Sequence, residues 1–475
     1  MSTIFEIPML IGGDWRPGKA YADVIGPWRK ETVSKMPLAT KEDIDDALNS
    51  AMEAKAEVAA MPGYERAAIL RRAGELIRER AEDIGKIMAR EIGREIKNGT
   101  AEVKRSQDTI SLSAEEAIRI EGEQVPLEGS ATGTGKIAML LRFPVGVVVG
   151  ITPFNAPFNL ACHKIGPAIA AGNAIVLKAS PQAPGVVHKL AEIFVDAGLP
   201  AGFLNVLYGH ADVGEALVKD PRTDFISFTG SSRAGAHIKQ NSGLKRIALE
   251  LGGNGPSIVC EDADIETAAP VCASNSSRLA GQSCISVQNV LVHERLFDAF
   301  VERMIPVMNS LRVGDPMDMN TDVGCLVDEA AAQRVEAWVN EARAAGAMVH
   351  TGGERKGAQY KPTLLSNVNS SMKVVRDEVF GPVLSVRKFK DVDEAIREVN
   401  SSNFGLQCGI FTKSLETGIK AAKEIRTGGI IINGSSTWRT DQLAYGGVKD
   451  SGIGREGPRY AIREMTEQRL IVFNL

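Results

Sequence analysis

Apolar and polar positions along this chain follow two different periods, which predict helices in some stretches and strands in others. Residues 9–27 hold short apolar stretches broken by Gly-Gly-Asp and Pro-Gly, a pattern typical of a small hairpin-like element. From Thr40 to about Val103, apolar residues recur at spacings of three and four, which predicts helices. Thr40 occupies an N-cap position followed by acidic residues, so we expect the first helix to begin there.

From about Leu140 to Ser231 the pattern changes to an alternation of buried strands and amphipathic helices. The predicted strands are nearly continuous apolar runs: PVGVVVGIT, NAIVLKAS, FLNVLYG and FISFTG. The segments between them carry the helical period: NLACHKIGPAIAAG, APGVVHKLAEIFVDAG and ADVGEALVKD. Strands of this kind indicate a parallel sheet covered by helices on both faces.

A second alternating series follows Glu250 and predicts a second α/β domain. It contains PSIVCEDA, a helix ending at Arg278, VQNVLVH, LFDAFVERMIPVMNSL, a helix around AAAQRVEAWVNEARAAG, and MKVVRDEVFGPVLSVRKF. Residues 121–142 and the terminal segment REMTEQRLIVFNL fall outside both series. We expect these two extended segments to pair and to add a strand to a neighbouring subunit. The predicted fold class is therefore α/β, with two doubly wound parallel-sheet domains and a small β arm.

The size and charge of the chain exclude several classes of function. At 475 residues the chain is too long for a single core and should form two or three domains. Its net charge of −4 leaves no basic excess for binding nucleic acid or an anionic membrane surface. Its apolar runs are too short to cross a bilayer, and MSTIFEIPML lacks the features of a secretory signal, so a cytoplasmic location is expected.

One of the six cysteines stands in a context that favours chemistry. The cysteines are spread singly without a CxxC pair, which argues against structural zinc and against a disulfide framework. Five of them are interpreted as small buried hydrophobes. Cys284, in LAGQSCISVQ, is paired in our hypothesis with Glu250, in LELGGN. A thiol is nucleophilic as its thiolate, and a carboxylate within reach can act as a general base.

A glycine-rich turn and a strand-end lysine raise the question of a dinucleotide. The Rossmann G-x-G-x-x-G fingerprint is absent after the first strand, but Gly230 and Gly235 enclose a turn between a predicted strand and a helix. No Lys-Ser or Lys-Thr follows, which excludes a Walker A motif. The Ser231 hydroxyl and the helix N-terminus would offer donors to a phosphate; a tight strand-to-helix turn is the alternative. Lys178 ends a strand at the sheet edge where ligands bind, although a solvated lysine would look the same.

Seven segments in fixed order carry a resemblance to a known family. They are PFNAP, VLKAS, FTGSSRAG, LELGGN, GQSC, EVFGPV and GGVKDSGIGREG. Over nearly its full length the chain resembles the NAD(P)-dependent aldehyde dehydrogenase superfamily. PFNAP, ACHK, GQSCISV and WRTD are most similar to the subgroup of lactaldehyde, non-phosphorylating glyceraldehyde-3-phosphate and phosphonoacetaldehyde dehydrogenases.

The resemblance implies a domain organisation and an assembly. It implies an NAD(P)-binding domain from residues 1–120 and 143–249, and a catalytic domain from residues 250–445. Residues 121–142 and 458–475 would form an arm for oligomerisation. A homo-oligomer, either a dimer or a homotetramer, is therefore expected, and the choice between the two stays open.

The resemblance also implies catalytic roles. Cys284 would attack the aldehyde carbonyl and form a thiohemiacetal. Asn155, with the Cys284 backbone N–H, would stabilise its oxyanion. After hydride transfer to the nicotinamide, Glu250 would activate the water that hydrolyses the thioester. The alternatives are a turn residue between two prolines for Asn155 and a strand-end surface carboxylate for Glu250.

The expected cofactor is NAD or NADP. Lys178 would hold the adenosine ribose, Ser231 the pyrophosphate, and Glu378 with Phe380 the nicotinamide ribose. The full cofactor set implied by the resemblance is Thr152, Pro153, Phe154, Lys178, Ser180, Pro181, Gly214, Thr229, Gly230, Ser231, Leu251, Gly252, Glu378 and Phe380. Pro181 replaces the glutamate that many NAD-preferring members carry three residues after the lysine. Without that carboxylate nothing repels a 2′-phosphate there, so use of NADP is a hypothesis.

The expected substrate is a small hydroxylated or anionic aldehyde, such as lactaldehyde. Asn159 and His163 lie four residues apart and would share one face of the helix after Asn155. Arg105 and Arg439 are assigned to the substrate's polar or anionic group, and Ser283 lies beside the nucleophile. The alternative is a core histidine and two arginines held in salt bridges. No metal is expected.

Two other functions were weighed against this one. A CoA-acylating relative would pass the acyl group to CoA and would generally lack the carboxylate at position 250, which this chain has. A non-catalytic scaffold of the same fold would have no need for nucleophile, oxyanion amide and base together. We therefore predict an aldehyde dehydrogenase that hydrolyses its thioester.

Overall fold

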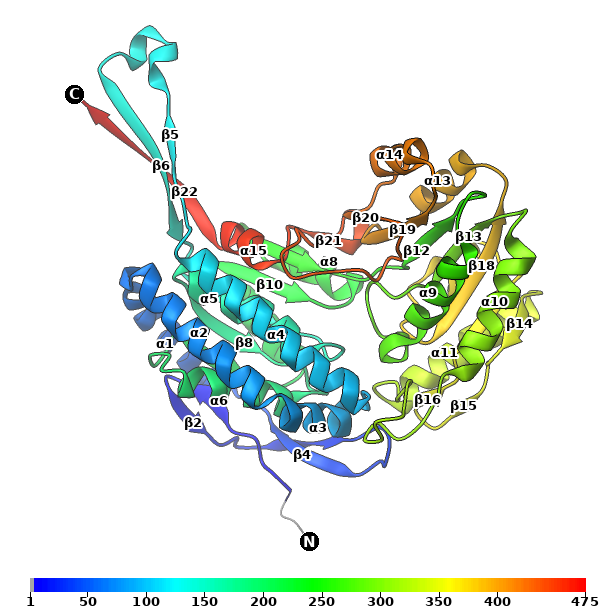
Figure 1. Ribbon diagram of the computed structural model, residues 1–475. Helices are drawn as coiled ribbons and strands as arrows, with labels where there is room; N and C mark the ends of the chain where they lie inside the picture. Colours follow the sequence, from blue (N-terminus) through cyan, green and yellow to red (C-terminus); the bar gives the residue numbers. More distant parts are fainter. Residues whose placement is uncertain (1–3) are drawn as a thin grey trace.

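The computed structural model describes residues 4–475 and contains two α/β bodies and a projecting arm (Figure 1). Each body is built on one large sheet, and the two bodies lie side by side with the arm rising from the first. Within residues 4–475, no helix is both long and apolar enough to span a bilayer.

The first body holds an eight-stranded sheet. Its order is β2 (Asp14–Arg16), β1 (Met9–Ile11), β9 (Leu204–Leu207), β8 (Ala174–Lys178), β7 (Val147–Ile151), β10 (Phe225–Thr229), β11 (Arg246–Glu250) and β21 (Gly452–Ile453). The five central strands run parallel, and four of them, β7, β8, β9 and β10, were predicted from their apolar character. β1, β2 and β21 are antiparallel additions at the two edges, so the sheet is mixed. At one edge Gly12 and Gly13, both at positive φ, turn the chain back into the predicted hairpin.

The helices of the first body pack around this sheet. They are α1 (Lys41–Ala60), α2 (Gly63–Glu79), α3 (Ala81–Ile92), α4 (Ile96–Ala117), α5 (Pro157–Ala171), α6 (Pro184–Asp196), α7 (Ala211–Lys219), α8 (Ser232–Asn241) and α15 (Pro458–Glu464). Thr40 caps α1 as predicted: its hydroxyl accepts from the Asp43 backbone, and the Asp43 carboxylate accepts from the Thr40 backbone.

The helical region runs further than the sequence pattern predicted. We expected it to end near Val103, but α4 continues to Ala117. Its last turns bury small polar residues, including Ser106 and Ser113, whose hydroxyls bond to backbone carbonyls one turn earlier. Their hydroxyl groups bond within the helix, and these polar residues interrupt an apolar face on which Val103, Ile110, Ala114 and Ala117 still recur at helical spacing. The sequence pattern is therefore weaker there than in the preceding helices.

The second body is a seven-stranded sheet covered on both faces. Its order is β14 (Met348–Thr351), β17 (Thr363–Ser366), β18 (Val383–Phe389), β13 (Asn289–His293), β12 (Pro256–Val259), β19 (Gln407–Phe411) and β20 (Gly429–Ile432). Only the pairing of the edge strand β14 is antiparallel among the strands of this sheet that the structure describes. Val290 and Val292 enter one apolar cluster and Leu291 the other, so β13 is buried on both sides, as the second series predicted.

The remaining helices belong to the second body, and two short pairs of strands lie outside the large sheets and the arm. The helices are α9 (Ile265–Ser277), α10 (Phe297–Ser310), α11 (Glu329–Ala344), α12 (Lys373–Arg376), α13 (Val392–Ser401) and α14 (Leu415–Glu424). Two small antiparallel pairs lie outside the large sheets: β3 (Tyr21–Ile25) with β4 (Thr32–Pro37), and β15 (Arg355–Lys356) with β16 (Gln359–Tyr360).

The arm is formed by the two extended segments that the sequence set apart. β6 (Lys136–Pro144) pairs antiparallel with β22 (Thr466–Asn474) along nine residue pairs, and β5 (Glu123–Val125) adds a short third strand. The pairing within the chain predicted for these segments is thus confirmed. β22 is an edge of this sheet, and both strands project beyond the first body (Figure 1).

Candidate active site

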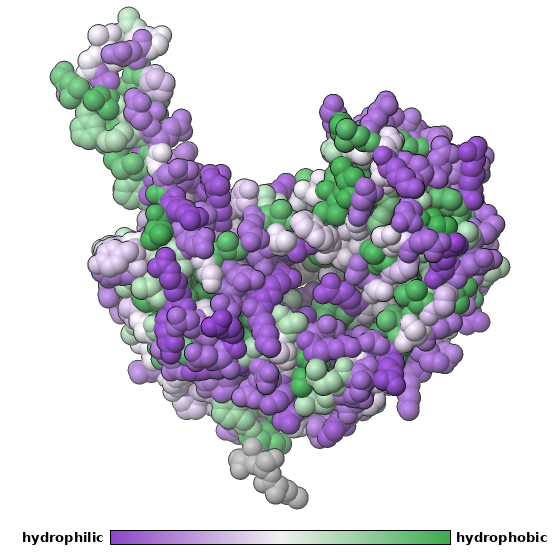
Figure 2. All heavy atoms as spheres, in the orientation of Figure 1, coloured by the Kyte–Doolittle hydropathy of each residue, from purple (hydrophilic) through white to green (hydrophobic). Residues whose placement is uncertain are grey.

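A cavity of about 530 Å³ lies between the two bodies and collects several of the predicted residues. Its walls come from α4, the start of α5, the turn before Cys284 and the segment that follows β20. The surface is visibly hollowed between the two halves of the molecule (Figure 2). A cavity of this size suits a small ligand. It is lined by Arg94, Asn98, Ala101, Glu102, Arg105, Asn155, Ala156, Asn159, Leu160, Val271, Asn275, Arg278, Leu279, Ser283, Cys284, Ile285, Gly434, Ser435, Thr437, Trp438, Arg439 and Tyr445.

Cys284 reaches this cavity because the chain turns sharply before it. Leu279 and Ala280 have φ of 56° and 51°, and Gly281 also has positive φ. A Cβ on Gly281 would lie 2.0 Å from the carbonyl oxygen of Gly381, so glycine is required there. The Cys284 side chain is partly buried, whereas the other five cysteines are buried, as predicted. Burial raises the pKa of the Cys284 thiol to about 11.

Asn155 lies directly before α5 and is tied to the segment that carries the cysteine. Its Nδ2 donates to the carbonyl oxygen of Gln282 at 3.0 Å, two residues before Cys284. Both Asn155 and Cys284 line the cavity. Asn155 and Cys284 therefore line the same space. If the sulfur attacked a carbonyl group there, the oxyanion formed on the carbonyl oxygen would lie in that space, near the Asn155 amide.

Glu250 ends β11 and is buried next to the cavity wall rather than exposed at a strand end. A Cβ on Gly446, the residue after Tyr445, would lie 2.9 Å from its Oε1. Neither carboxylate oxygen has a hydrogen-bond partner among residues 4–475. Burial and then the charge of Glu456 raise the pKa of Glu250 well above its usual range. Nearby, a Cβ on Gly253 would lie 2.6 Å from the Cys284 carbonyl oxygen, which shows how closely the two segments pack.

A buried network of charges lies behind these residues. Arg439 pairs with Glu456 at 2.6 Å, and its Nη2 lies 3.2 Å from His163. Arg105 binds Asp441 with two nitrogens at 2.9 and 3.0 Å, and His163 binds the same carboxylate at 3.0 Å. Both arginines predicted to receive substrate are thus neutralised by carboxylates of the chain itself.

The other predicted substrate residues occupy different positions relative to the cavity. Asn159 and Ser283 line it, and Asn159 accepts a hydrogen bond from Thr109 at 2.9 Å. His163 is buried and does not line the cavity. It contacts the lining residue Arg439 directly, and it binds Asp441, which in turn binds the lining residue Arg105.

Four residues of the site were not predicted from the sequence. Glu102 caps α5 from the neighbouring helix α4: its Oε1 accepts from the backbone N–H groups of Phe158 and Asn159 at 3.1 and 3.0 Å. Arg94 forms an ion pair with Glu102 and donates to the carbonyl oxygen of Asn155 at 3.2 Å. Arg94 lies in the connection between α3 and α4, and Glu102 lies inside α4, so nothing local in the sequence signals this contact.

Arg278 and Tyr445 are the other two. The Arg278 side chain is exposed at the cavity and has no ion-pair partner among the residues that the structure describes, unlike the other three arginines of the lining. The Tyr445 hydroxyl lies 3.1 Å from Cys284 Sγ. Arg278 lies only six residues before Cys284, and this closeness to the predicted nucleophile is the one sequence signal that could have placed Arg278 in the site.

The predicted cofactor residues gather at one edge of the first sheet. Two of these residues are the last of their strands: Lys178 ends β8 and Thr229 ends β10. Others directly follow a strand, namely Thr152, Pro153 and Phe154 after β7, Ser180 and Pro181 after β8, Gly230 and Ser231 after β10, and Leu251 and Gly252 after β11. Gly214 lies in α7. This is the carboxyl edge of the parallel strands, where ligands of such sheets bind.

The chemistry of this edge fits a dinucleotide. Ser231 caps α8, whose N-terminus opens toward the same edge, and Thr152 Oγ1 is buried without a partner among the described residues. Burial lowers the pKa of Lys178 to about 8. From the second body, Glu378 accepts from the backbone N–H of Gly253 at 3.1 Å, and burial raises its pKa to about 7. Phe380 packs edge-on against Phe154.

Comparison with known proteins identifies the family. Residues 15–471 match the model of the aldehyde dehydrogenase family. The chain is 44% identical to 3-sulfolactaldehyde dehydrogenase of Priestia aryabhattai, over 100% of this chain and 99% of the relative. It is 38% identical to lactaldehyde dehydrogenase of Methanocaldococcus jannaschii, over 98% of this chain and 100% of the relative.

A solved structure agrees with both the fold and the sequence match. The NADP-dependent glyceraldehyde-3-phosphate dehydrogenase of Bacillus halodurans C-125, complexed with NADP, superposes with a TM-score of 0.97 at 34% identity, covering 99% of this chain and all of that one. The resemblance stated from the sequence motifs is therefore confirmed. The chain belongs to the aldehyde dehydrogenase family.

Proposed function

We propose that this aldehyde dehydrogenase oxidises a small anionic or hydroxylated aldehyde to the carboxylic acid, with NAD or NADP as oxidant. The observation that carries the proposal is a single cavity in which the Cys284 thiol and the Asn155 amide meet, with the unpartnered Glu250 carboxyl buried beside them. The names of similar proteins support the reaction class, and two of them act on sulfolactaldehyde and lactaldehyde.

The residues of the chain divide the reaction into two halves. The thiolate of Cys284 attacks the aldehyde carbonyl, and the Asn155 amide with the Cys284 backbone N–H stabilises the resulting oxyanion. A bound nicotinamide supplies the hydride acceptor that turns this thiohemiacetal into a thioester. Glu250, once ionised, takes a proton from the water that attacks the thioester, which releases the acid and the Cys284 thiolate.

The cofactor would be held at the carboxyl edge of the first sheet. We assign the pyrophosphate to Ser231 and the N-terminus of α8, the adenosine ribose to Lys178, and the nicotinamide ribose to Glu378. Pro181 leaves no carboxylate to repel a 2′-phosphate, so we propose that NADP is accepted. In domain terms, residues 1–120 and 143–249 would bind the cofactor and residues 250–445 would supply the nucleophile.

Arg278 is our candidate for the anionic group of the substrate. The guanidinium groups of Arg94, Arg105 and Arg439 already face carboxylates of the chain, whereas Arg278 is exposed at the cavity without one. A paired arginine would have to give up its carboxylate partner to bind a substrate anion, and the buried carboxylate would then be left unpaired. Arg278 has no such partner to lose, so it can bind an added anion at lower cost. A sulfonate, phosphonate or carboxylate on a short aldehyde would supply that anion.

The first experiment follows absorbance at 340 nm with NAD and with NADP over short aldehydes of equal length. Cys284→Ala should abolish turnover, and Glu250→Gln should give one burst of reduced cofactor per site followed by a slow steady state. Added CoA should not accelerate the Glu250→Gln variant. Acceleration by CoA would favour the acyl-transfer alternative, and turnover by Cys284→Ala would refute the mechanism.

The second experiment tests the substrate class. Arg278→Gln should raise KM for 3-sulfolactaldehyde roughly 10- to 100-fold, because a charge-assisted hydrogen bond contributes about 1.5–3 kcal/mol, and should leave KM for neutral lactaldehyde unchanged. Arg295→Gln is the matched control, since Arg295 is 77% exposed on the second body. Equal effects on both aldehydes would refute the assignment of Arg278.

We further propose that the arm joins copies of this chain. Ile137, Leu470, Val472 and Phe473 are between 43% and 58% exposed. Leu470 and Val472 lie on one face of the arm sheet, and Phe473 with its cross-strand partner Ile137 lies on the other, so both faces carry exposed apolar side chains. Figure 2 shows apolar residues along the arm. Exposed apolar surface on an unpaired edge strand is a usual mark of association.

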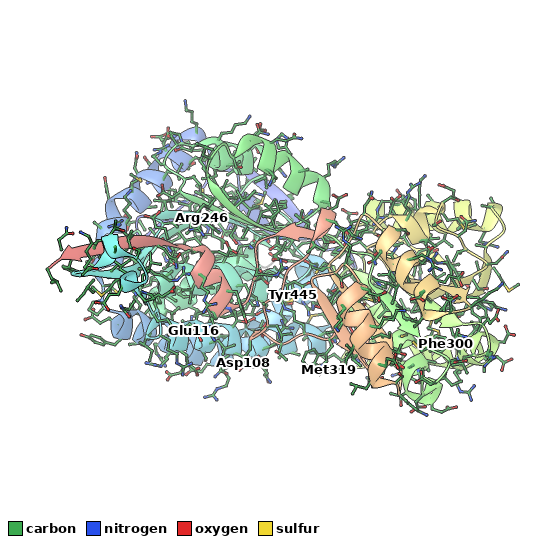
Figure 3. The ribbon with its side chains drawn as sticks, turned by 90° about the horizontal axis from the view of Figure 1, so that it is seen from above. Asp108, Glu116, Arg246, Phe300, Met319 and Tyr445 are labelled. Atoms are coloured by element: carbon green, nitrogen blue, oxygen red, sulfur yellow. The ribbon has the colours of Figure 1, made fainter. Side chains whose placement is uncertain are left out.

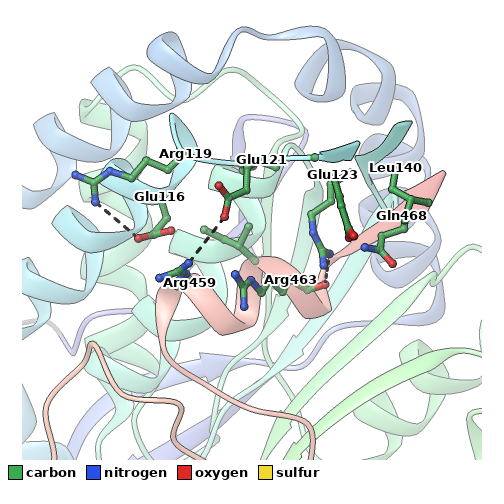
Figure 4. Close-up of a pocket in the computed structure, with 12 residues that line it drawn as sticks. Glu116, Arg119, Glu121, Glu123, Leu140, Arg459, Arg463 and Gln468 are labelled. Carbon is green, nitrogen blue, oxygen red and sulfur yellow. Dashed lines mark hydrogen bonds and ion pairs between the residues drawn. The ribbon is translucent and has the colours of Figure 1, made fainter. Parts of the chain in front are cut away.

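At the base of the arm is a hollow of about 240 Å³ between α4, α15 and the arm strands. There Arg119 faces Glu116 and Arg459 faces Glu121 at 3.8 and 3.9 Å (Figure 4). These charges are already paired within one chain, so we take them as a polar rim of the same interface. Light scattering on the purified protein would give the number of copies, and a monomer at micromolar concentration would refute the assembly.

A further inference from the structure

Tyr445 contacts the atom on which the proposed reaction depends. Its hydroxyl lies 3.1 Å from Cys284 Sγ, and in the part of the chain that the structure describes it is the one polar side chain hydrogen-bonded to that sulfur. The side chain is only 5% exposed, and Figure 3 places Tyr445 between the two bodies of the molecule.

The surroundings of the thiol disfavour its ionised form. Burial raises the pKa of Cys284 to about 11, and the carboxylates of Glu250 and Glu378 raise it further. The Tyr445 hydroxyl and the charge of Arg439 act in the opposite direction and lower the pKa of Cys284. Both groups therefore favour a nucleophilic thiolate in this site.

The hydroxyl of Tyr445 is suited to donate rather than accept. Burial raises the pKa of Tyr445 well above its usual range, so the phenol keeps its proton at every pH at which an aldehyde dehydrogenase could work. A protonated hydroxyl next to a sulfur anion donates, and hydrogen bonds to charged groups are about twice as strong as neutral ones.

Arg439 holds the ring of Tyr445 in place. Its guanidinium carbon lies 3.8 Å from the centre of the Tyr445 ring, a cation–π contact in a buried site. Glu456 at 2.6 Å and His163 at 3.2 Å both contact Nη2 of the same guanidinium, whereas its Nε is buried without a hydrogen-bond partner among the described residues. The positive charge thus faces the aromatic ring, and one of its nitrogens is held by the chain.

We propose that Tyr445 is a catalytic residue that donates a hydrogen bond to the Cys284 thiolate, and that Arg439 is a positioning residue that acts through it. The proposal rests on Cys284 being the nucleophile. When the sulfur attacks the aldehyde, its negative charge moves to the carbonyl oxygen, and the tyrosine keeps its proton. When water attacks the thioester, the sulfur leaves as thiolate and recovers the same hydrogen bond. This assignment differs from the one predicted from the sequence, in which Arg439 receives the substrate.

The test measures the ionisation of the thiol in the enzyme without substrate or cofactor. The rate of alkylation by iodoacetamide is followed against pH, with thiolate absorbance at 240 nm as a second readout. Tyr445→Phe removes one oxygen atom and keeps the ring, so the fold and the stacked arginine are retained. We expect the midpoint of the profile to rise by about one to two pH units and kcat/KM to fall roughly 10- to 100-fold.

The controls separate this proposal from its alternatives. Tyr360→Phe removes the hydroxyl of another buried tyrosine, which has no hydrogen-bond partner among the described residues, and should leave the profile unchanged. Arg439→Met should also raise the midpoint, and the double variant with Tyr445→Phe should go no further than Tyr445→Phe alone. An unchanged midpoint in Tyr445→Phe would overturn the role of the tyrosine.

Two further variants test the role of Arg439 and the role of Cys284 separately. If Arg439→Met raises KM for an anionic aldehyde without moving the midpoint, Arg439 binds substrate and its positioning role is overturned. Cys284→Ala reports on the nucleophile itself: if it retains turnover, the proposed mechanism fails, whereas loss of turnover with an unchanged Tyr445→Phe profile overturns only the inference about Tyr445.

Discussion

Exchange of Glu102 for glutamine should destabilise the protein and slow catalysis, because this carboxylate serves two segments at once. It pairs with Arg94, and it accepts two backbone N–H groups at the start of α5, the helix that follows Asn155. The side chains of Arg94 and Glu102 are 10% and 5% exposed, so the ion pair is shielded from water. Glutamine keeps an oxygen for the helix cap and removes only the charge.

The size of the effect follows from that burial. Removing one partner of a buried ion pair leaves the other charge unpaired, which costs about 3–5 kcal/mol. We expect Glu102→Gln to lower the free energy of unfolding by about 3 kcal/mol. Arg94→Met should cost a similar amount. The double variant leaves no buried charge, so it should cost less than the sum by about 2 kcal/mol.

Urea unfolding followed by tryptophan fluorescence would measure these differences, with kcat recorded on the same samples. Arg94 also holds the carbonyl oxygen of Asn155, so kcat should fall in each single variant, by at most the 100- to 1,000-fold that loss of an oxyanion donor costs. Glu42→Gln is the control, since its pair with Lys19 is well exposed and should contribute little to stability. The reasoning is refuted if Glu102→Gln costs no more than Glu42→Gln, or if the double variant equals the sum of the single ones.

Four further changes test other parts of the structure. Because burial raises the pKa of Glu250 above its usual range, hydrolysis of a preformed thioester should slow as the pH falls through that raised value; a rate that stays flat down to pH 5 would contradict its role as base. Pro181→Glu should raise KM for NADP relative to NAD by at least tenfold in steady-state assays, and an unchanged ratio would exclude this position as a determinant. Leu470→Glu with Phe473→Glu should dissociate the assembly in light scattering while each chain keeps its helical circular dichroism. Thr40→Ala should cost about 1 kcal/mol in urea unfolding, because the capping box at α1 is lost, whereas Thr40→Ser should cost little.

The sequence predicted those parts of the molecule that depend on local patterns. Apolar runs identified β7, β8, β9 and β10 of the first sheet and β12, β13 and β18 of the second, and the N-cap at Thr40 identified the start of α1. The strands β11, β17, β19 and β20 were not predicted. The end of α4 was missed because buried serines interrupt its apolar face. The hairpin of β1 and β2 was predicted, whereas the edge strand β21 was missed because it reaches the first sheet from residues far along the chain, where no local pattern records the pairing.

The same distinction applies to the candidate site. Cys284 and Asn155 stand in motifs that could be found in order along the chain, and both line one cavity. The partner of Arg105 could not be found because Asp441 lies 336 residues away along the chain. Glu456 lies only 17 residues after Arg439, but no local pattern records that these two side chains pair. A sequence shows that an arginine is present but not whether a carboxylate of the same chain already neutralises it. That Arg278 has no such partner among the described residues can be seen only in the folded structure.

The pairing of β6 with β22 also constrains how the molecule is made. Lys136 and Asn474, which face each other at the tip of the arm, are 338 residues apart. During synthesis β6 must therefore wait, with its apolar residues unprotected, until the whole of the second body has been made, because β22 follows that body in the chain. At the rate of roughly 5–20 residues per second typical of translation, that delay is on the order of tens of seconds. Nascent chains would be most prone to aggregate in this interval, and chaperones would have the greatest effect on yield then.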